Sequence, residues 1–362
     1  MTQPTRRSNR PANRPSGGRG GAGGHTRRPT AGAPPRSIRW LLWLATPFAL
    51  VGLGLLLLVA APQLQAQHQW LAMAASFAPY GWLAWLVAVV LALIGSRGRV
   101  RLLVAPLALG LAWHTGVLLP YLPAPARASA AGSTSLSVLE LNLRWGLADL
   151  DQVAEEVGRR RPDVVVLAEV TRSDAKAFAH RPWSKLLPYR TGTAGDDYST
   201  TTWTGDARGT MVLSRHPITP LDGTDDTLFS NFAVTLGVPD HPLTLVAAHP
   251  ANPKHGLNRW LDDATSLTRL ALEHTGGPLL VVGDLNATAE HLTLRELTAK
   301  AGLTDAGAGE GWHPTYPADA WYPPLIQIDH VLVSNDFSAT GYRTFRIDGT
   351  DHLGLDVTLA LG

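Results

Sequence analysis

The segment Leu279–Asn286 reads Leu-Leu-Val-Val-Gly-Asp-Leu-Asn, an apolar run that ends in a carboxylate and an amide. Short apolar runs bounded by turn residues are typical of buried β-strands. Asp284 and Asn286 would then lie at the carboxyl end of the strand, where open α/β folds place their functional sites. The segment therefore predicts a buried strand with a polar site at one end.

Polar residues also accompany other apolar runs. Asn142, Glu169 and His249 end such runs, Asp329 lies in Ile-Asp-His-Val-Leu-Val at 328–333, and the pair Asp351-His352 precedes the last strand. An Asp or Asn at a strand end is often only a turn former, so each residue alone is a weak indication. The ordered series, together with Asp284 and Asn286, predicts one site assembled from several strand ends.

Strand-like and helical segments alternate through the second part of the chain. Helical periodicity is clear in 149–160, 256–274 and 291–301. The strand-like runs are 136–144, 163–170, 210–214, 232–236, 243–248, 279–283, 325–334, 339–347 and 353–359. Some of these strands follow one another directly and others are separated by helices, so we expect mixed sheets and an α/β fold.

This combination of motifs resembles the endonuclease/exonuclease/phosphatase superfamily over residues 136–362. Gly-Asp-Leu-Asn at 283–286 and the pair Asp351-His352 are the most specific elements. Glu169, Gly-Thr-Met-Val-Leu-Ser-Arg-His-Pro-Ile at 209–218 and Ile-Asp-His-Val-Leu-Val-Ser at 328–334 support them. The resemblance implies a four-layer α/β sandwich of two mixed β-sheets. It also implies hydrolysis of phosphate esters with a bound Mg²⁺ or Mn²⁺, a hard cation that prefers oxygen ligands.

The resemblance also implies roles for the residues at the strand ends. Glu169 corresponds to the principal metal ligand, with Asn142 beside it and Asp351 supporting the metal through water. Asp284 would orient or deprotonate the attacking water, and Asn286 would hold that water or the phosphate. Such positioning supplies much of the rate in phosphoryl transfer.

Histidines and arginines complete the expected site. His352 would contact the phosphoryl oxygen, while Asp329 holds its other ring nitrogen and raises its basicity. His249 is a candidate phosphate ligand, and Arg215 and Arg144 are candidate substrate contacts. Arg144 is also a departure from the pattern, because family nucleases often carry Asp at that place. This weakens a nuclease assignment.

The first 135 residues differ in kind from the remainder. They contain thirteen Arg but no Lys, Asp or Glu, whereas residues 136–362 carry 29 acidic against 18 basic residues, a balance of −11. A bilayer core about 30 Å thick needs about 20 apolar residues per helix. Three runs are long enough and predict a three-helix transmembrane anchor: 40–61, 70–94 and 102–122.

The chain has no cysteine, which excludes disulfides and thiolate metal sites.

The placement of arginine predicts the orientation of this anchor. The Arg/Gly-rich tail 1–39, which we expect to be disordered, precedes the first span, and Ser96–Arg101 carries three Arg. The loop Gln63–Gln69 carries none. By the positive-inside rule the N-terminus lies in the cytoplasm of a bacterial-type cell. The catalytic domain 136–362 then lies outside the membrane, attached by the linker 123–135.

These features predict a membrane-anchored, metal-dependent phosphohydrolase acting on a lipid-linked phosphate or pyrophosphate. The architecture also resembles a branch of three-span bacterial proteins associated with glycopeptide resistance, which implies undecaprenyl pyrophosphate as a substrate. An extracytoplasmic nuclease is the alternative, although an acidic domain with four Lys disfavours non-specific nucleic-acid binding. A non-catalytic membrane scaffold is a third possibility, disfavoured because the expected catalytic positions are filled.

Overall fold

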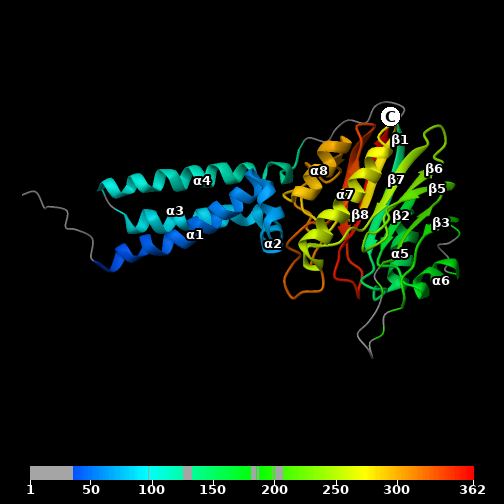
Figure 1. Cartoon of the computed structure of the whole chain (residues 1–362), viewed down its shortest axis with the longest axis horizontal. Helices are drawn as coiled ribbons and strands as arrows, with labels where there is room; N and C mark the ends of the chain where they lie inside the picture. Colours follow the sequence, from blue (N-terminus) through cyan, green and yellow to red (C-terminus); the bar gives the residue numbers. More distant parts are fainter. Residues whose placement is uncertain are drawn as a thin grey trace, which may run out of the picture.

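The N-terminal part of the chain forms a bundle of apolar helices that projects from an α/β domain (Figure 1). The computed structural model describes residues 36–96, 98–124, 133–180, 185, 187–197, 199, 206 and 208–362. The expected disordered tail and most of the expected linker therefore lie outside the described residues.

The bundle consists of α1 (Arg36–Ala60), α3 (Gly81–Gly95) and α4 (Val104–Gly116). Helix α3 packs against both of the others, and the Trp85 indole fills the space beside Gly52 of α1 and Gly110 of α4. A Cβ at either glycine would come within 2.9 Å of the indole ring. Small residues that admit a large partner are typical of packing between membrane helices. Two segments are long and apolar enough to cross a membrane: Arg39–Ala60 and Ala78–Gly95.

The second and third predicted spans differ from the observed helices. The run 70–94 is divided into α2 (Gln69–Ala75), the turn η2 (Ala78–Tyr80) and α3. Pro79 explains the break, because proline lacks an N–H and disfavours helical geometry in the residue before it. In the third run, α4 has 13 residues and is about 20 Å long at 1.5 Å per residue. The short turns η3 (Gly98–Leu103) and η4 (Leu119–Tyr121) flank it.

The α/β domain contains two six-stranded mixed sheets. The first sheet has the order β11-β12-β1-β2-β4-β3 and the second β5-β6-β7-β8-β10-β9. The strands of the first sheet are β1 (Thr134–Asn142), β2 (Val164–Ala168), β3 (Tyr189–Gly192), β4 (Thr210–Ser214), β11 (Phe337–Phe345) and β12 (Gly354–Leu361). Those of the second are β5 (Ile218–Gly223), β6 (Phe232–Leu236), β7 (Leu243–Ala248), β8 (Leu279–Asp284), β9 (Thr304–Asp305) and β10 (Asp329–Val333).

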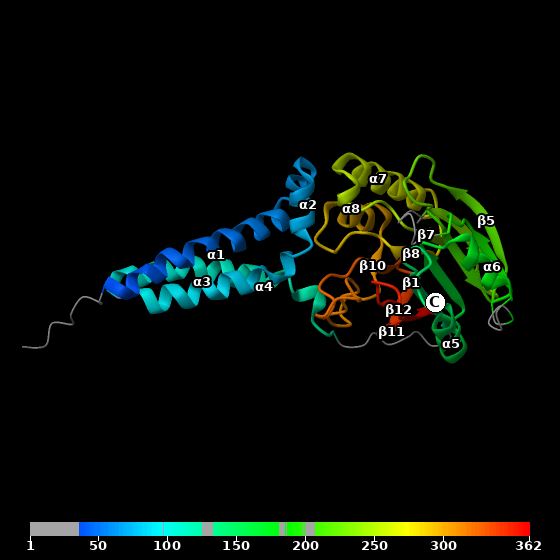
Figure 2. The ribbon, with the colours of Figure 1, turned by 90° about the horizontal axis from the view of Figure 1, so that it is seen from below.

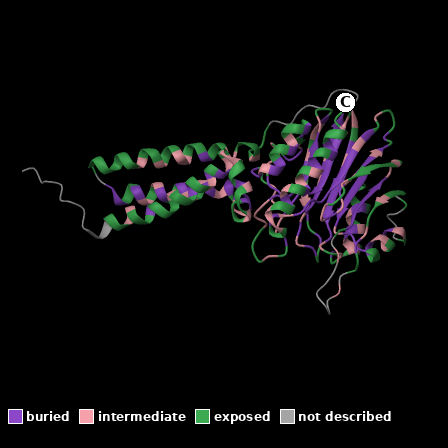
Figure 3. Cartoon of the chain, in the orientation of Figure 1, coloured by how far each residue is buried: buried purple, intermediate pink, exposed green. Residues whose placement is uncertain are grey.

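The sheets pack face to face, with helices on their outer faces (Figure 2). Alternating side chains of β1 and β8, such as Val138 and Val282, form the core between the sheets. On the outside, α5 (Leu150–Arg160) and α6 (Arg172–His180) cover the first sheet, and α7 (Leu257–Glu273) and α8 (Leu292–Ala301) cover the second. Figure 3 shows the contrast between the buried strands and the largely exposed helices of the bundle. The expected sandwich of two mixed sheets is confirmed.

The bundle is joined to the α/β domain by specific polar contacts. Gln65, which is fully buried in the turn η1 (Pro62–Gln67), donates to the carbonyls of Leu58 and Glu290 at 3.0 and 2.9 Å. Its side-chain oxygen accepts from the amide of Leu292 at 2.9 Å. Arg295 donates to the carbonyl of Val59 at 2.6 Å. One side chain therefore joins the end of α1 to the start of α8.

His291 forms a second contact of this junction. Its Nε2 donates to the carbonyl of Ala72 in α2 at 2.9 Å, and its Nδ1 accepts from the amide of Thr288 at 2.7 Å. Burial lowers the pKa of His291 from 6.5 to about 4. The ring is thus neutral at pH 7, and a proton on Nδ1 would face an N–H donor.

We expect acid to weaken this junction through His291. The unfolded chain takes up the proton near pH 6.5 and the folded chain near pH 4, so the contribution is complete above 6.5 and is lost as the pH falls toward 4. His291→Gln keeps a donor for Ala72 but cannot titrate. Its Tm should therefore fall less between pH 7 and pH 4.5 than that of the wild type, measured on full-length protein in detergent. His216→Gln is the matched control, and equal losses in wild type and His291→Gln would contradict the prediction.

Candidate active site

Strand register brings the predicted residues of both sheets to one edge. Asn142 pairs with Ala168 in the parallel strands β1 and β2, so Glu169 follows directly beside it. In the second sheet Asp329 pairs with Asp284 across β10 and β8. His249 comes directly after β7, which runs parallel to β8. The carboxyl ends of four strands thus supply one site.

The Asn142 side chain connects the two sheets. Its Nδ2 donates to Glu169 Oε1 at 3.1 Å and to Asp284 Oδ2 at 3.0 Å, and its Oδ1 accepts from the Arg144 amide at 2.8 Å. Glu169 has a positive φ of 55°, and its Oε2 accepts from the Trp145 amide at 2.8 Å. A non-glycine residue in this conformation is held against local strain, as is frequent at functional sites.

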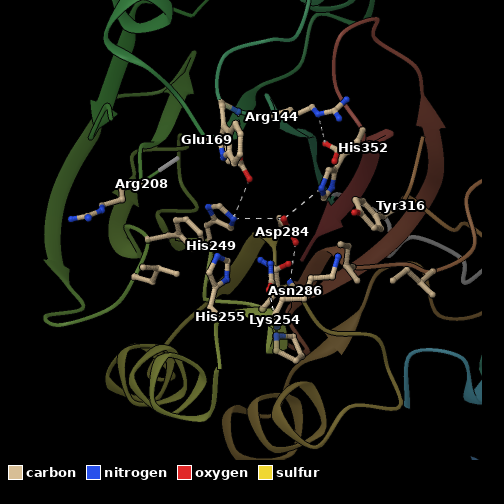
Figure 4. A pocket seen from close by; sticks show the side chains of 18 of the residues that line it. Arg144, Glu169, Arg208, His249, Lys254, His255, Asp284, Asn286, Tyr316 and His352 are labelled. Carbon is tan, nitrogen blue, oxygen red and sulfur yellow. Dashed lines mark hydrogen bonds and ion pairs between the residues drawn. The ribbon is translucent and has the colours of Figure 1, made fainter. Parts of the chain in front are cut away.

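His352 and Asp329 form a buried ion pair beside Asp284. His352 Nδ1 donates to both Asp329 oxygens at 3.0 and 2.9 Å, and its Nε2 lies 3.8 Å from Asp284 Oδ2. Burial opposes a charge on His352, but the carboxylates of Asp329 and Asp284 outweigh it and raise its pKa well above 6.5. His352 is thus a fixed cation that points its free N–H toward the centre of the site (Figure 4).

His249 is the opposite case, a neutral histidine. Its Nε2 lies 3.7 Å from Asp284 Oδ2 and 3.9 Å from Glu169 Oε1, and its ring stacks on Phe229 with centroids 4.1 Å apart. Burial, with the nearby positive charge of His352, lowers the pKa of His249 to about 3. Its Nδ1 has no hydrogen-bond partner in the described part of the chain. A neutral ring can serve as a ligand for a phosphate hydroxyl or a cation.

The carboxylates of Glu169 and Asp284 fit a divalent cation. Burial raises the pKa of Glu169, and burial raises that of Asp284 to about 7 although His352 opposes the shift. Among the described residues, no Lys or Arg lies within 4.0 Å of either carboxylate. Oxygen donors from the buried Asp284 and the half-buried Glu169, with no described Lys or Arg beside them, suit a hard cation such as Mg²⁺.

Other groupings of the same residues fit a cation less well. Asp284, Asp329 and His352 offer ligand atoms within 4.8 Å of one another. However, the raised pKa of His352 favours a proton on each of its ring nitrogens. Both Asp329 oxygens accept hydrogen bonds from that ring. A protonated imidazole is not a metal ligand. Asn142 turns its amide nitrogen toward the carboxylates and so orients Glu169 and Asp284. Its role as a metal ligand stays a prediction.

The remaining predicted residues divide into two groups. Asn286 donates its backbone N–H to Asp284 Oδ1 at 2.9 Å and lines the cavity. Arg144 and Asp351 also line it, with Arg144 Nε 3.7 Å from Asp351 and Arg144 Nη1 2.7 Å from Asp319. Arg215, a predicted substrate contact, does not line the cavity.

Arg215 follows β4, whose end at Ser214 pairs with Val164 at the start of β2. Its guanidinium lies 3.5 Å from Asp163 and donates to the Arg161 carbonyl. Arg215 is therefore at the edge opposite to Glu169. The error arose because the strand–turn–basic pattern of 210–215 does not say which edge the turn occupies.

The cavity has a volume of about 920 Å³ and includes residues that the sequence did not indicate. Arg208, Lys254 and His255 contribute nitrogen groups to it, and Tyr316 lies beside His352 with ring centroids 5.1 Å apart. Three residues come from the helical part: Met73, Ser76 and Phe77. None of them ends an apolar strand, so the pattern of a polar residue after an apolar run could not identify them.

Glu140 was also missed as a residue of the site. It follows Val138 by two residues and so lies on the same inner face of β1. It is fully buried, and neither carboxyl oxygen has a hydrogen-bond partner among the described residues. Burial, with Asp329 and Asp284 nearby, raises the pKa of Glu140 well above 4.5. A charged residue at an inward position of an alternating strand is the sequence signal that marks it.

Replacement of Glu140 by an apolar residue should stabilise the fold. A buried polar group without a partner costs about 1–3 kcal/mol, and Met has a similar shape without that cost. We expect Glu140→Met to raise the free energy of unfolding by about that amount in denaturant titrations at pH 7. The exposed Glu155→Met on α5 serves as control and should change stability by less than about 0.5 kcal/mol. A clear loss of stability in Glu140→Met would contradict the assignment of an unpartnered carboxyl.

Comparison with known proteins identifies the fold. The family model described as Endonuclease/Exonuclease/phosphatase family matches residues 139–352. A protein of that description from Beutenbergia cavernae has a solved structure with 21% identity and a TM-score of 0.46, covering 63% of this chain and 72% of that one. The mannosyl-6-phosphatase Bt3783 of Bacteroides thetaiotaomicron shows 16% identity and a TM-score of 0.46, with 62% and 99% covered. The structure of D. rerio TDP2 complexed with single-strand DNA product shows 16% identity and a TM-score of 0.48, covering 62% of this chain and 99% of that one. No curated protein matches the sequence.

The family model spans more than half of the chain and includes the site from Asn142 to His352. Its members are metal-dependent hydrolases of phosphate esters, in agreement with the buried carboxylates and the cationic His352. The chain belongs to the endonuclease/exonuclease/phosphatase family and is a metal-dependent phosphoester hydrolase.

Proposed function

We propose that this hydrolase is anchored in the cell membrane and acts on a lipid-linked phosphate or pyrophosphate at the external face. Undecaprenyl pyrophosphate is the specific candidate. The observation that carries the proposal is the fixed junction between the apolar helices and the catalytic domain, formed by Gln65, His291 and Arg295. A site held beside the bilayer meets lipid substrates at high effective concentration.

The surface of the bundle supports membrane insertion. Large apolar side chains face outward along α1 and α4, among them Trp43, Leu50, Leu109 and Trp113. Soluble proteins rarely expose a continuous apolar surface of this extent. Lipid would cover these side chains and remove the cost of their exposure to water.

We propose three crossings, with α4 as the third. Helix α4 packs on α3 within the same bundle and exposes Leu109 and Trp113 on its outer side. In the span 102–122, the 3₁₀ residues on both sides of α4 rise about 2 Å each, so the span approaches the thickness of a bilayer core. Arg99 and Arg101 of η3 then lie at the cytoplasmic surface, and the catalytic domain lies outside.

The site residues account for hydrolysis in the following way. His352, fixed as a cation by Asp329, donates from Nε2 to a phosphoryl oxygen and stabilises the charge that develops there. Asp284 orients the attacking water and accepts its proton. Asn286 and His249 position the phosphate and the water. A divalent cation, which we propose is Mg²⁺ or Mn²⁺, would neutralise phosphoryl charge beside Glu169.

Charge at the cavity favours a small phosphorylated group over a nucleic acid. Lys254 and Arg208 line the cavity, Arg208 with its Nε 3.3 Å from Asp206, and they suit a second phosphate, as in a pyrophosphate. Two arginines outside the cavity are already paired, Arg215 with Asp163 and Arg259 with Asp263, each at 3.5 Å. They do not form the basic stripe that tracks a nucleic-acid backbone.

The substrate class is tested by measuring hydrolysis with full-length protein in detergent and Mg²⁺, as inorganic phosphate from a pyrophosphate and as cleaved lipid or DNA products from a diester. Undecaprenyl pyrophosphate, a phospholipid and plasmid DNA are the three substrates. We expect hydrolysis of the polyprenyl pyrophosphate to exceed that of the others at least tenfold, and a chelator to abolish it until Mg²⁺ or Mn²⁺ is restored. Nicking of the plasmid without lipid hydrolysis would overturn the proposal in favour of a nuclease.

Two variants make this test specific to the site. Asp284→Asn removes the proton acceptor, and we expect about a thousandfold loss of turnover with the fold retained. Arg215→Ala, at the opposite edge, should keep activity within about twofold. Equal activity of Asp284→Asn and wild type would show that the site is assigned to the wrong residues.

The number of crossings decides the side on which the C-terminus lies. With a cytoplasmic N-terminus, three crossings place Gly362 outside the cell and two place it inside. We expect alkaline phosphatase fused after Gly362 to be active and a β-galactosidase fusion at the same position to be inactive. The reverse result would remove both the third crossing and the external location.

A further inference from the structure

The catalytic cavity has a wall that the catalytic domain does not supply. Met73 of α2, with Ser76 and Phe77 of the following turn, lines the same cavity as Asp284 and His352. These residues belong to the segment between the two membrane-length helices, which end and begin at Ala60 and Ala78. The helical part therefore takes part in the site itself.

The wall is held in place from both ends. His291 of the catalytic domain donates to the Ala72 carbonyl next to Met73 at 2.9 Å. On the other side of Phe77, the Tyr80 hydroxyl donates to the Leu325 carbonyl at 2.6 Å. Tyr80 also packs edge-on against Trp312, with ring centroids 5.8 Å apart. Met73 and Phe77 lie between two anchored points, so their position relative to the site is fixed.

Apolar residues of the catalytic domain line the cavity together with this wall. They are Ile326 and Ile328. Ile326 directly follows Leu325, which accepts the Tyr80 hydrogen bond, and Ile328 directly precedes Asp329, which holds His352. The cavity therefore has apolar side chains both at α2 and beside the catalytic pair.

The cavity lining is of two chemical kinds. The carboxylates and His352 suit a phosphate group, whereas Met73 and Phe77 present apolar surface on α2 and the turn after it. Helix α2 packs on η6 (Pro253–His255), which carries Lys254. Phe77 remains 44% exposed, so its ring is available to an apolar ligand. The matching ligand is an amphiphile with phosphate at its head and hydrocarbon directly behind it.

We propose that Met73 and Phe77 form a subsite for the hydrocarbon units next to the phosphate of a membrane-bound substrate. This inference rests on the proposed function and extends it, because it makes the anchor a determinant of specificity. A chain that passes over Met73 and Phe77 leaves the cavity where α1 and α3 reach the catalytic domain, and there it continues into the bilayer. The occupant is thus the lipid chain of the substrate, in contact with the short helix between two membrane helices.

The test compares two probes with one headgroup, geranylgeranyl diphosphate and methyl diphosphate, on full-length protein in detergent. Phe77→Ala and Met73→Ala should each lower kcat/KM for the long probe about tenfold, since a contact of this size is worth about one tenfold step. Both should leave kcat/KM for the short probe within about twofold. Activity on the short probe also reports that each variant is folded.

Matched variants complete the design. Leu71→Ala truncates an apolar side chain of the same helix that does not line the cavity, and it should affect neither probe. Phe77→Leu keeps an apolar wall and should retain most of the activity on the long probe. Equal losses on both probes, or no loss on either, would overturn the subsite and leave the proposed function standing. Failure of the wild type to hydrolyse either diphosphate would overturn the proposed function, and the subsite with it.

Discussion

One side-chain amide holds the active site together. Asn142 Nδ2 donates to Glu169 of the first sheet and to Asp284 of the second, at 3.1 and 3.0 Å. Without it, two buried carboxylates from different sheets would face each other with no donor between them. Hydrogen bonds from a neutral amide to charged partners are strong in a buried setting, where unpaired charge is costly. The two sheets must therefore keep their relative position for Asn142 to reach both.

The site contains more buried ionisable groups than the fold requires. His249 is kept neutral, His352 is kept charged, and Glu140 is buried without a partner. His249 Nδ1 and Glu140 depart from the rule that buried polar groups are paired, whereas His352 is charged within a buried ion pair with Asp329. Such departures lower stability and persist where function needs them. The two all-apolar layers of side chains outside the sheets supply the compensating stability.

The sequence predicted the parts of the site that repeat one local pattern. An apolar strand followed by a polar residue identified Glu169, His249 and Asp284. The apolar run indicates a buried strand, and the polar residue after it marks the carboxyl end, where the site lies. The edge strands β3 and β5 were missed because their exposed residues carry no apolar pattern. Arg215 was misplaced, since local sequence does not encode the direction in which a following turn faces. The second apolar run was read as one helix, although Pro79 divides it in the structure.

The boundary between anchor and enzyme is where local sequence is least informative. Composition changes sharply at residue 135, and a division there separates apolar helices from an acidic α/β domain. The contacts cross that division: Gln65, Tyr80 and Tyr121 of the helical part bond to residues 290–325. A long-range hydrogen bond produces no repeating pattern in the sequence of either segment, because it needs only one donor residue and one acceptor. A division by composition therefore separates two segments that fold as one, and it assigns the residues that line one cavity to different parts.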